Sequence, residues 1–170
     1  MNGTEIMREL PEIANIEDED LREKTLMTYE AATARGGWSS LHDIPFTLLI
    51  PGLDRDYVDH VRRVTSSARA VAATRDDLDM DIVTAGALLH DVGKLLEYEP
   101  VDPVVKSDFG KLVRHPVSGA ALAMEFDLPD EIVHLIAAHS KEGEAVSRTA
   151  EAILIHHCDF IDFEIEKTKH

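Results

Sequence analysis

The sequence contains a single cysteine, Cys158, among its 170 residues, so no disulfide can form within the chain and a reducing compartment is expected. It also lacks any apolar run of about 18 residues, the length that a membrane-spanning helix needs. Residues 1–19 contain no basic segment followed by an apolar one, so we expect no secretory signal there. These absences predict a cytoplasmic protein that contacts no membrane.

Basic residues are scarce. The chain has 17 lysines and arginines against 33 aspartates and glutamates, which gives a formal net charge of −16. Such a surface favours solubility and repels the phosphate backbones of nucleic acids. We therefore expect long DNA or RNA to be excluded as a partner.

Segments with the two-residue alternation of β-strands are absent as well. Apolar residues instead recur at helical spacing, as Val61, Val64 and Ala68 do between residues 54 and 74. We expect helices over residues 16–35, 54–74, 80–97, 116–126, 130–139 and 148–166. The fold class is therefore predicted to be all-α, and the length suits one compact helical bundle. In this prediction residues 1–53 form a helix and loop that pack on the core, residues 54–166 form the main domain, and residues 167–170 form a tail.

The strongest chemical signal is the segment Leu-Leu-His-Asp-Val-Gly-Lys at residues 88–94, because it places His90, Asp91 and Lys94 in the most apolar helix. Uncompensated burial of such groups costs several kcal/mol, and a divalent cation is a partner that suits histidine and aspartate together. Adjacent helical residues point about 100° apart, so the pair can hold one ion or the carboxylate can bridge two. Lys94 lies one turn farther along, where it could bind a substrate oxyanion, pair with Asp91, or extend to solvent.

With this His-Asp pair, the chain resembles the HD-domain superfamily of metal-dependent phosphohydrolases over residues 54–166. Family members supply one histidine from an upstream helix and an aspartate from a late helix, and binuclear branches add two histidines between the pair and that aspartate. The resemblance implies a bundle with two divalent transition-metal ions in its core and Asp91 bridging them. Iron or manganese is favoured, and zinc, nickel or cobalt is also compatible with this ligation. The implied ligands are His60, His90, Asp91, His115, His139 and Asp159.

Other polar residues have open roles. The second His-Asp pair, His42-Asp43, lies in a proline-flanked loop and is interpreted as structural, or at most as part of a lid. His156 and Asp162 lie one turn on either side of Asp159, and each either orients a ligand or is a solvated side chain. Lys141 follows His139 closely and either contacts an anionic substrate or belongs to an exposed turn.

The resemblance implies a hydrolase that cleaves a phosphate ester or anhydride with a metal-activated water. Asp91 and Lys94 are the expected catalytic residues, Lys94 and Lys141 bind substrate, and a small phosphorylated metabolite or nucleotide is the expected partner. The Gly-Tyr-Pro signature of the cyclic-dinucleotide branch is absent, which disfavours that substrate. Two alternatives stay open, a di-iron oxygenase of the same superfamily and a ligand-sensing domain without turnover. A homodimer is compatible with the sequence.

Overall fold

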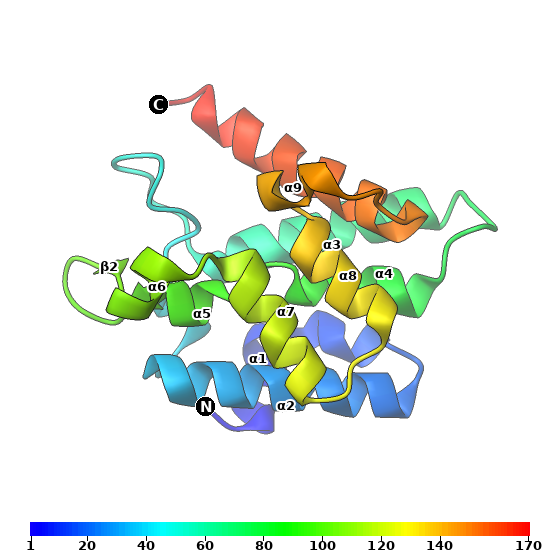
Figure 1. The fold of residues 1–170 in the computed structure, drawn as a ribbon, viewed down its shortest axis with the longest axis horizontal. Coiled ribbons are helices and arrows are strands. Elements are labelled where there is room, and N and C mark those ends of the chain that lie inside the picture. The colour runs from blue at the N-terminus through cyan, green and yellow to red at the C-terminus, as the bar shows by residue number, and fades with distance from the viewer.

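Helices account for nearly all of the regular structure in the computed structural model, which describes residues 1–170 and confirms the all-α prediction (Figure 1). The only strands are β1 (Tyr98–Glu99) and β2 (Val105–Lys106), which pair in an antiparallel hairpin. Short 3₁₀ helices are η1 (Pro11–Asn15), η2 (Leu41–Asp43) and η3 (Lys141–Ala145). The α-helices are α1 (Gly3–Glu9), α2 (Glu19–Gly36), α3 (Tyr57–Ala72), α4 (Met80–Leu89), α5 (Lys94–Glu97), α6 (Asp108–Leu112), α7 (His115–Glu125), α8 (Asp130–Ala138) and α9 (Ala150–Lys167).

Side-chain caps decide where several helices begin. The Asp56 carboxylate accepts a hydrogen bond from the Asp59 backbone N–H at 2.8 Å, so α3 begins at Tyr57 rather than at the predicted residue 54. Asp18 caps α2 in the same way, and Gly37 ends it with a φ of 76°, a conformation that glycine adopts readily.

The predicted helix over residues 80–97 is wrong, because the chain breaks into α4 and α5 at residues 90–93. Tight turns replace the helical pattern there, with Lys94 N–H donating to the Asp91 carbonyl at 2.9 Å. Gly93 permits close packing at the break, since a Cβ atom at this position would lie only 2.1 Å from the carbonyl oxygen of His115. The turn brings residues 90–94 directly against α7, an approach that a regular helix with larger side chains could not make.

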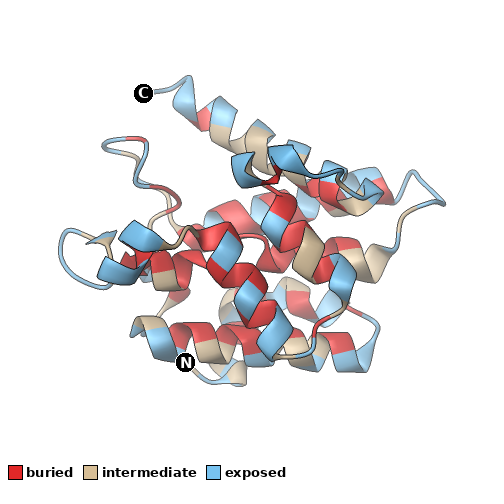
Figure 2. Ribbon diagram, in the orientation of Figure 1, coloured by how far each residue is buried: buried red, intermediate tan, exposed pale blue.

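The centre of the bundle is α4, whose residues from Val83 to Leu89 are all buried, and which packs against α3, α8 and α9 (Figure 2). On its other side, Tyr29 of α2 donates a hydrogen bond to the Leu88 carbonyl, and Trp38 donates one to the Leu95 carbonyl at 2.8 Å. Helix α2 therefore packs on the core, while the domain boundary placed at residue 53 stays a prediction. None of the helices combines the length and the apolar character needed to cross a membrane.

Candidate metal centre

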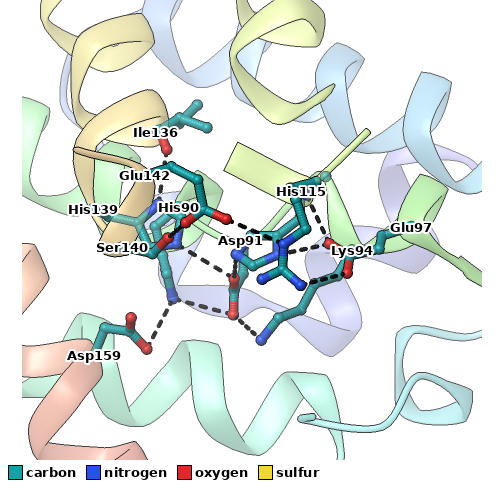
Figure 3. Close-up of polar contacts among 12 residues, drawn as sticks. His90, Asp91, Lys94, Glu97, His115, Ile136, His139, Ser140, Glu142 and Asp159 are labelled. Atoms are coloured by element: carbon teal, nitrogen blue, oxygen red, sulfur yellow. Dashed lines mark hydrogen bonds and ion pairs between the residues drawn. The ribbon is translucent and has the colours of Figure 1, made fainter. Parts of the chain in front are cut away.

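The residues expected to bind metal come from five helical segments and lie close together, and Figure 3 labels all of them except His60. His60 lies on α3, and His90 and Asp91 lie in the turn that ends α4. His115 begins α7, His139 ends α8, and Asp159 lies on α9. All six side chains are largely buried; the most exposed is that of Asp159, at 14%. The fold thus assembles residues that are up to 99 positions apart in the sequence.

Asp91 lies at the centre of the cluster, and its two carboxylate oxygens face different pairs of histidines. Its Oδ2 atom is 3.3 Å from Nε2 of His60 and 3.4 Å from Nε2 of His90. Its Oδ1 atom is 3.2 Å from Nε2 of His115 and 3.6 Å from Nε2 of His139. This arrangement divides the cluster into two half-sites that share one carboxylate.

Asp159 belongs to the first half-site. Its Oδ1 atom is 3.3 Å from Nε2 of His60 and 3.9 Å from Nε2 of His90. Burial raises the pKa of Asp159, but a hydrogen bond from His60 and the nearby histidine charges outweigh it and lower the pKa to about 2. The carboxylate is therefore ionised and available to a cation at neutral pH.

The orientation of each imidazole ring is set by an acceptor at its Nδ1 atom. His90 and His139 stand at the ends of their helices, where Nδ1 hydrogen bonds to the carbonyls of Ala87 and Ile136 at 2.7 and 2.8 Å. A carbonyl only accepts, so Nδ1 carries the hydrogen and Nε2 keeps its lone pair. A carboxylate plays this part for the other two rings: Asp162 for His60 and Glu97 for His115, each at 2.8 Å. Anchored Nδ1 atoms of this kind are characteristic of metal-ligating histidines.

These groups fit a divalent transition-metal ion. Nε2 of His60 and Nε2 of His90 lie 3.2 Å apart, a distance at which two lone pairs require a proton or a cation between them. Burial lowers the pKa of His60, but hydrogen bonds to Asp159, Asp162 and Asp91 raise it to about 9. Without a metal, the His60 imidazole therefore carries an extra proton between ionised carboxylates, and the mixed nitrogen and oxygen donors suit a metal ion at the same place.

Lys94 is buried beside this cluster and does not extend to solvent. Its ammonium donates to Asp91 Oδ2 at 2.5 Å and to the Phe46 carbonyl at 2.8 Å. Burial lowers the pKa of Lys94, but the charge of Asp91, the nearby groups of Tyr98 and Asp159 and the hydrogen bond to Asp91 together outweigh it, so the net shift is upward. Lys94 is consequently a fixed positive charge at the edge of the cluster.

Sequence reasoning missed Glu97, which is only 1% exposed. One of its oxygens accepts hydrogen bonds from both the backbone N–H and Nδ1 of His115, at 2.7 and 2.8 Å. Burial raises the pKa of Glu97, but hydrogen bonds from His115 and Lys106 lower it to about 2. An available signal was a glutamate inside the apolar segment that follows the His-Asp pair.

The remaining candidates lie at different distances from the cluster. Asp162 contacts it through His60, and Arg55 in turn donates to Asp162 at 3.0 Å. Nδ1 of His156 hydrogen bonds to the His139 carbonyl at 2.6 Å. His42 pairs instead with Asp56, with 53% of its side chain exposed, and makes no contact with the cluster.

A cavity of about 360 Å³ opens beside Asp91, Asp159 and His115. Its apolar wall includes Phe46, Leu49, Phe160 and Phe163. Five of the 17 basic side chains of the protein also line it, against four acidic ones. The basic residues are Lys94, Lys106, Arg114, Lys141 and Lys167.

Comparisons with known proteins return two kinds of ribonuclease. Over 97 residues the chain is 36% identical to ribonuclease Y of Acidothermus cellulolyticus, an alignment that covers 57% of this chain and 17% of that relative. Over 115 residues it is 30% identical to the 3′-5′ exoribonuclease YhaM of Bacillus subtilis. That alignment covers 61% of this chain and 37% of that relative. The chain thus spans well under half of these relatives. No solved structure matches it.

The ribonuclease relatives overturn the expectation that long nucleic acid is excluded and that the only partner is a small phosphorylated metabolite. That expectation used the net charge of −16, which averages over the whole surface. Charges in water are screened within about 8 Å at physiological ionic strength, so a ligand responds to the residues near its site. The cavity is lined by five basic and four acidic side chains, so its charge is close to balanced, whereas the chain as a whole is strongly acidic.

The family model of the HD domain matches residues 57–163 of the chain, which is more than half of its length. This match and the ribonuclease relatives support the expected metal-dependent hydrolysis of phosphoester bonds. The geometry of the His60, His90, Asp91, His115 and His139 cluster agrees with it. We conclude that the chain belongs to the HD-domain family.

Proposed function

We propose that this protein is a phosphodiesterase that cleaves RNA at a centre of two divalent metal ions. The observation that carries the proposal is the position of Asp91, whose two oxygens each face a separate pair of histidine Nε2 atoms. One half-site contains His60, His90 and Asp159, and the other contains His115 and His139. Iron or manganese fits this mixture of imidazole and carboxylate ligands.

When bound, two such ions supply Lewis acidity and lower the pKa of a coordinated water to near neutrality. The protein keeps the Nε2 lone pairs aimed at the centre, because every Nδ1 atom is hydrogen bonded. The ligands therefore need little rearrangement during the reaction, which is the basis of electrostatic preorganisation.

Lys94 is the proposed catalytic cation. An ammonium has three N–H donors, and Asp91 and the Phe46 carbonyl accept only two of them. Lys94 also lines the cavity, so its third N–H is available to a phosphoryl oxygen. Charge that builds on that oxygen in the transition state would be stabilised by the fixed ammonium.

The cavity supports RNA as the substrate class. Its volume of about 360 Å³ lies within the range of small-ligand sites, so it can take one nucleotide unit of a longer strand. Phe160 and Phe163 offer faces on which an unstacked base can lie, and the basic side chains, among them Lys141, can contact phosphates. The ribonuclease relatives favour this reaction over oxygen activation and over ligand sensing without turnover.

The proposal is tested with an end-labelled single-stranded RNA and with bis(p-nitrophenyl) phosphate, using protein loaded with manganese or iron. We expect hydrolysis of both compounds, loss of activity with a chelator, and recovery when metal is added back. His139→Gln should lose activity, whereas His42→Gln, which changes an exposed histidine outside the cluster, should keep it. Metal-loaded protein that hydrolyses neither compound would refute the proposal.

A further inference from the structure

Two basic side chains on the cavity wall share one oxygen of a buried carboxylate. Lys106 Nζ and Arg114 Nη1 both donate to Glu97 Oε1, at 2.8 and 3.2 Å. The other oxygen of Glu97 is occupied by His115. The two positive charges are therefore adjacent, and one side chain, Glu97, connects them to a residue of the metal centre.

Both basic side chains keep donors that face away from Glu97. Arg114 uses Nη1 for Glu97 and Nε for Glu142, at 3.2 and 3.1 Å, and its Nη2 group makes no hydrogen bond within the protein. Lys106 uses one of its three ammonium protons. The side chains of Lys106 and Arg114 are 33% and 42% exposed, and both line the cavity. The free donors are thus accessible from the cavity that also reaches Asp91.

We propose that Lys106 and Arg114 bind a second phosphate of the substrate, next to the phosphodiester that is cleaved. This inference rests on the proposed function and narrows it, because the preferred substrate then carries a phosphate on a nucleotide adjoining the scissile bond. A planar guanidinium and a neighbouring ammonium suit a phosphate group, which accepts several hydrogen bonds at once. The position of Glu97 places the pair beside the centre rather than at a remote surface.

Charge balance favours an anion over a neutral group. Lys106 and Arg114 pair with Glu97 and Glu142, and Lys141 also lines the cavity, so these five side chains together carry one net positive charge. Outside the cavity, acidic side chains outnumber basic ones by a wide margin. A terminal or internal phosphate of an RNA strand supplies the required charge, and contacts of this kind set the register of the strand.

The experiment compares kcat/KM for the dinucleotides UpU, pUpU and UpUp, which differ only in a terminal phosphate. Wild-type protein should prefer pUpU or UpUp over UpU by about 10- to 100-fold, the ratio that a hydrogen bond between charged groups provides. Which of the two is preferred identifies whether the 5′ or the 3′ neighbour carries the second phosphate. Lys106→Gln and Arg114→Gln should reduce this ratio towards one. Lys111→Gln should preserve it, because Lys111 pairs with Asp108 on α6 and does not line the cavity.

The outcomes separate the two proposals. Equal rates on all three dinucleotides would overturn the second-phosphate site. An equal loss on every dinucleotide in the Lys106 and Arg114 variants, with the ratio unchanged, would also overturn it and assign the pair to holding Glu97. Failure of wild-type, metal-loaded protein to hydrolyse even bis(p-nitrophenyl) phosphate, which has no second phosphate, would instead refute the proposed function.

Discussion

Replacing Glu97 with glutamine isolates the contribution of one buried carboxylate to folding. Every partner of Glu97 is a donor: the backbone N–H and Nδ1 of His115, Lys106 and Arg114. The amide group of a glutamine would therefore be buried against donors without an acceptor. Hydrogen bonds to a charged group contribute roughly 1.5–3 kcal/mol each, and at least one of them is lost. The lowering of the Glu97 pKa from 4.5 to about 2 corresponds to about 3 kcal/mol, in agreement with that range.

The assay is urea unfolding of the metal-free proteins at pH 7. With a slope of about 2 kcal/mol per molar urea, the midpoint of Glu97→Gln should lie about 1.5 M below that of the wild type. Glu125→Gln is the matched control and should leave the midpoint nearly unchanged, because Glu125 pairs with Arg35 on the exposed surface.

The stability that Glu97 contributes to the folded protein should decrease on acidification. The folded-state pKa of Glu97 is lowered, so its stabilisation is complete above pH 4.5 and is lost as the pH falls from there towards 2. The gap between wild type and Glu97→Gln should therefore shrink by about 1 kcal/mol between pH 7 and pH 4. Equal midpoints at pH 7, or a gap that widens on acidification, would refute this account of Glu97.

Three further predictions concern the centre itself. Asp91→Ala should lose both metal ions, because each half-site loses an oxygen ligand; elemental analysis checks this, and a full metal complement would rule out the bridging position. Lys94→Ala should keep its metal but lower kcat on RNA by a factor on the order of 10², as is typical for one electrostatic donor. An unchanged kcat would leave Lys94 as only a partner of Asp91. Finally, cleavage of a phosphodiester should proceed under strict anaerobiosis with manganese or zinc, since hydrolysis needs no change of valence; oxygen consumption without phosphodiester cleavage would favour the oxygenase alternative.

The positions of the candidate ligands could be predicted from sequence because histidine and aspartate are rarely buried without a partner. His90 and Asp91 stood out for this reason, and the resemblance then located residues such as His115 and Asp159, which the structure brings beside them. The domain boundaries and the role of each residue stay predictions.

The supporting contacts could not be predicted in the same way. Glu97 and His115 are 18 residues apart and separated by a hairpin and α6, so only the tertiary structure shows that one anchors the other. The close approach of Gly93 to α7, at the break before α5, is a tertiary contact that helical periodicity does not record. The exclusion of nucleic acid failed because composition gives the total charge and not its distribution over the surface.

One of the two acceptors of the Lys94 ammonium is the backbone carbonyl of Phe46, and this affects which substitutions the surrounding loop can accept. The loop that contains it is closed at its base, where Phe46 N–H donates to the Arg55 carbonyl at 3.0 Å and Tyr57 N–H donates to the Ile44 carbonyl at 2.8 Å. Residues 47–54 form the tip beyond this closure, and Thr47 to Ile50 line the cavity. Substitutions or insertions in the tip can therefore reshape substrate selectivity while the Phe46 carbonyl, and the lysine that it fixes, stay in place. New substrate preferences can evolve at this loop without loss of the proposed catalytic cation.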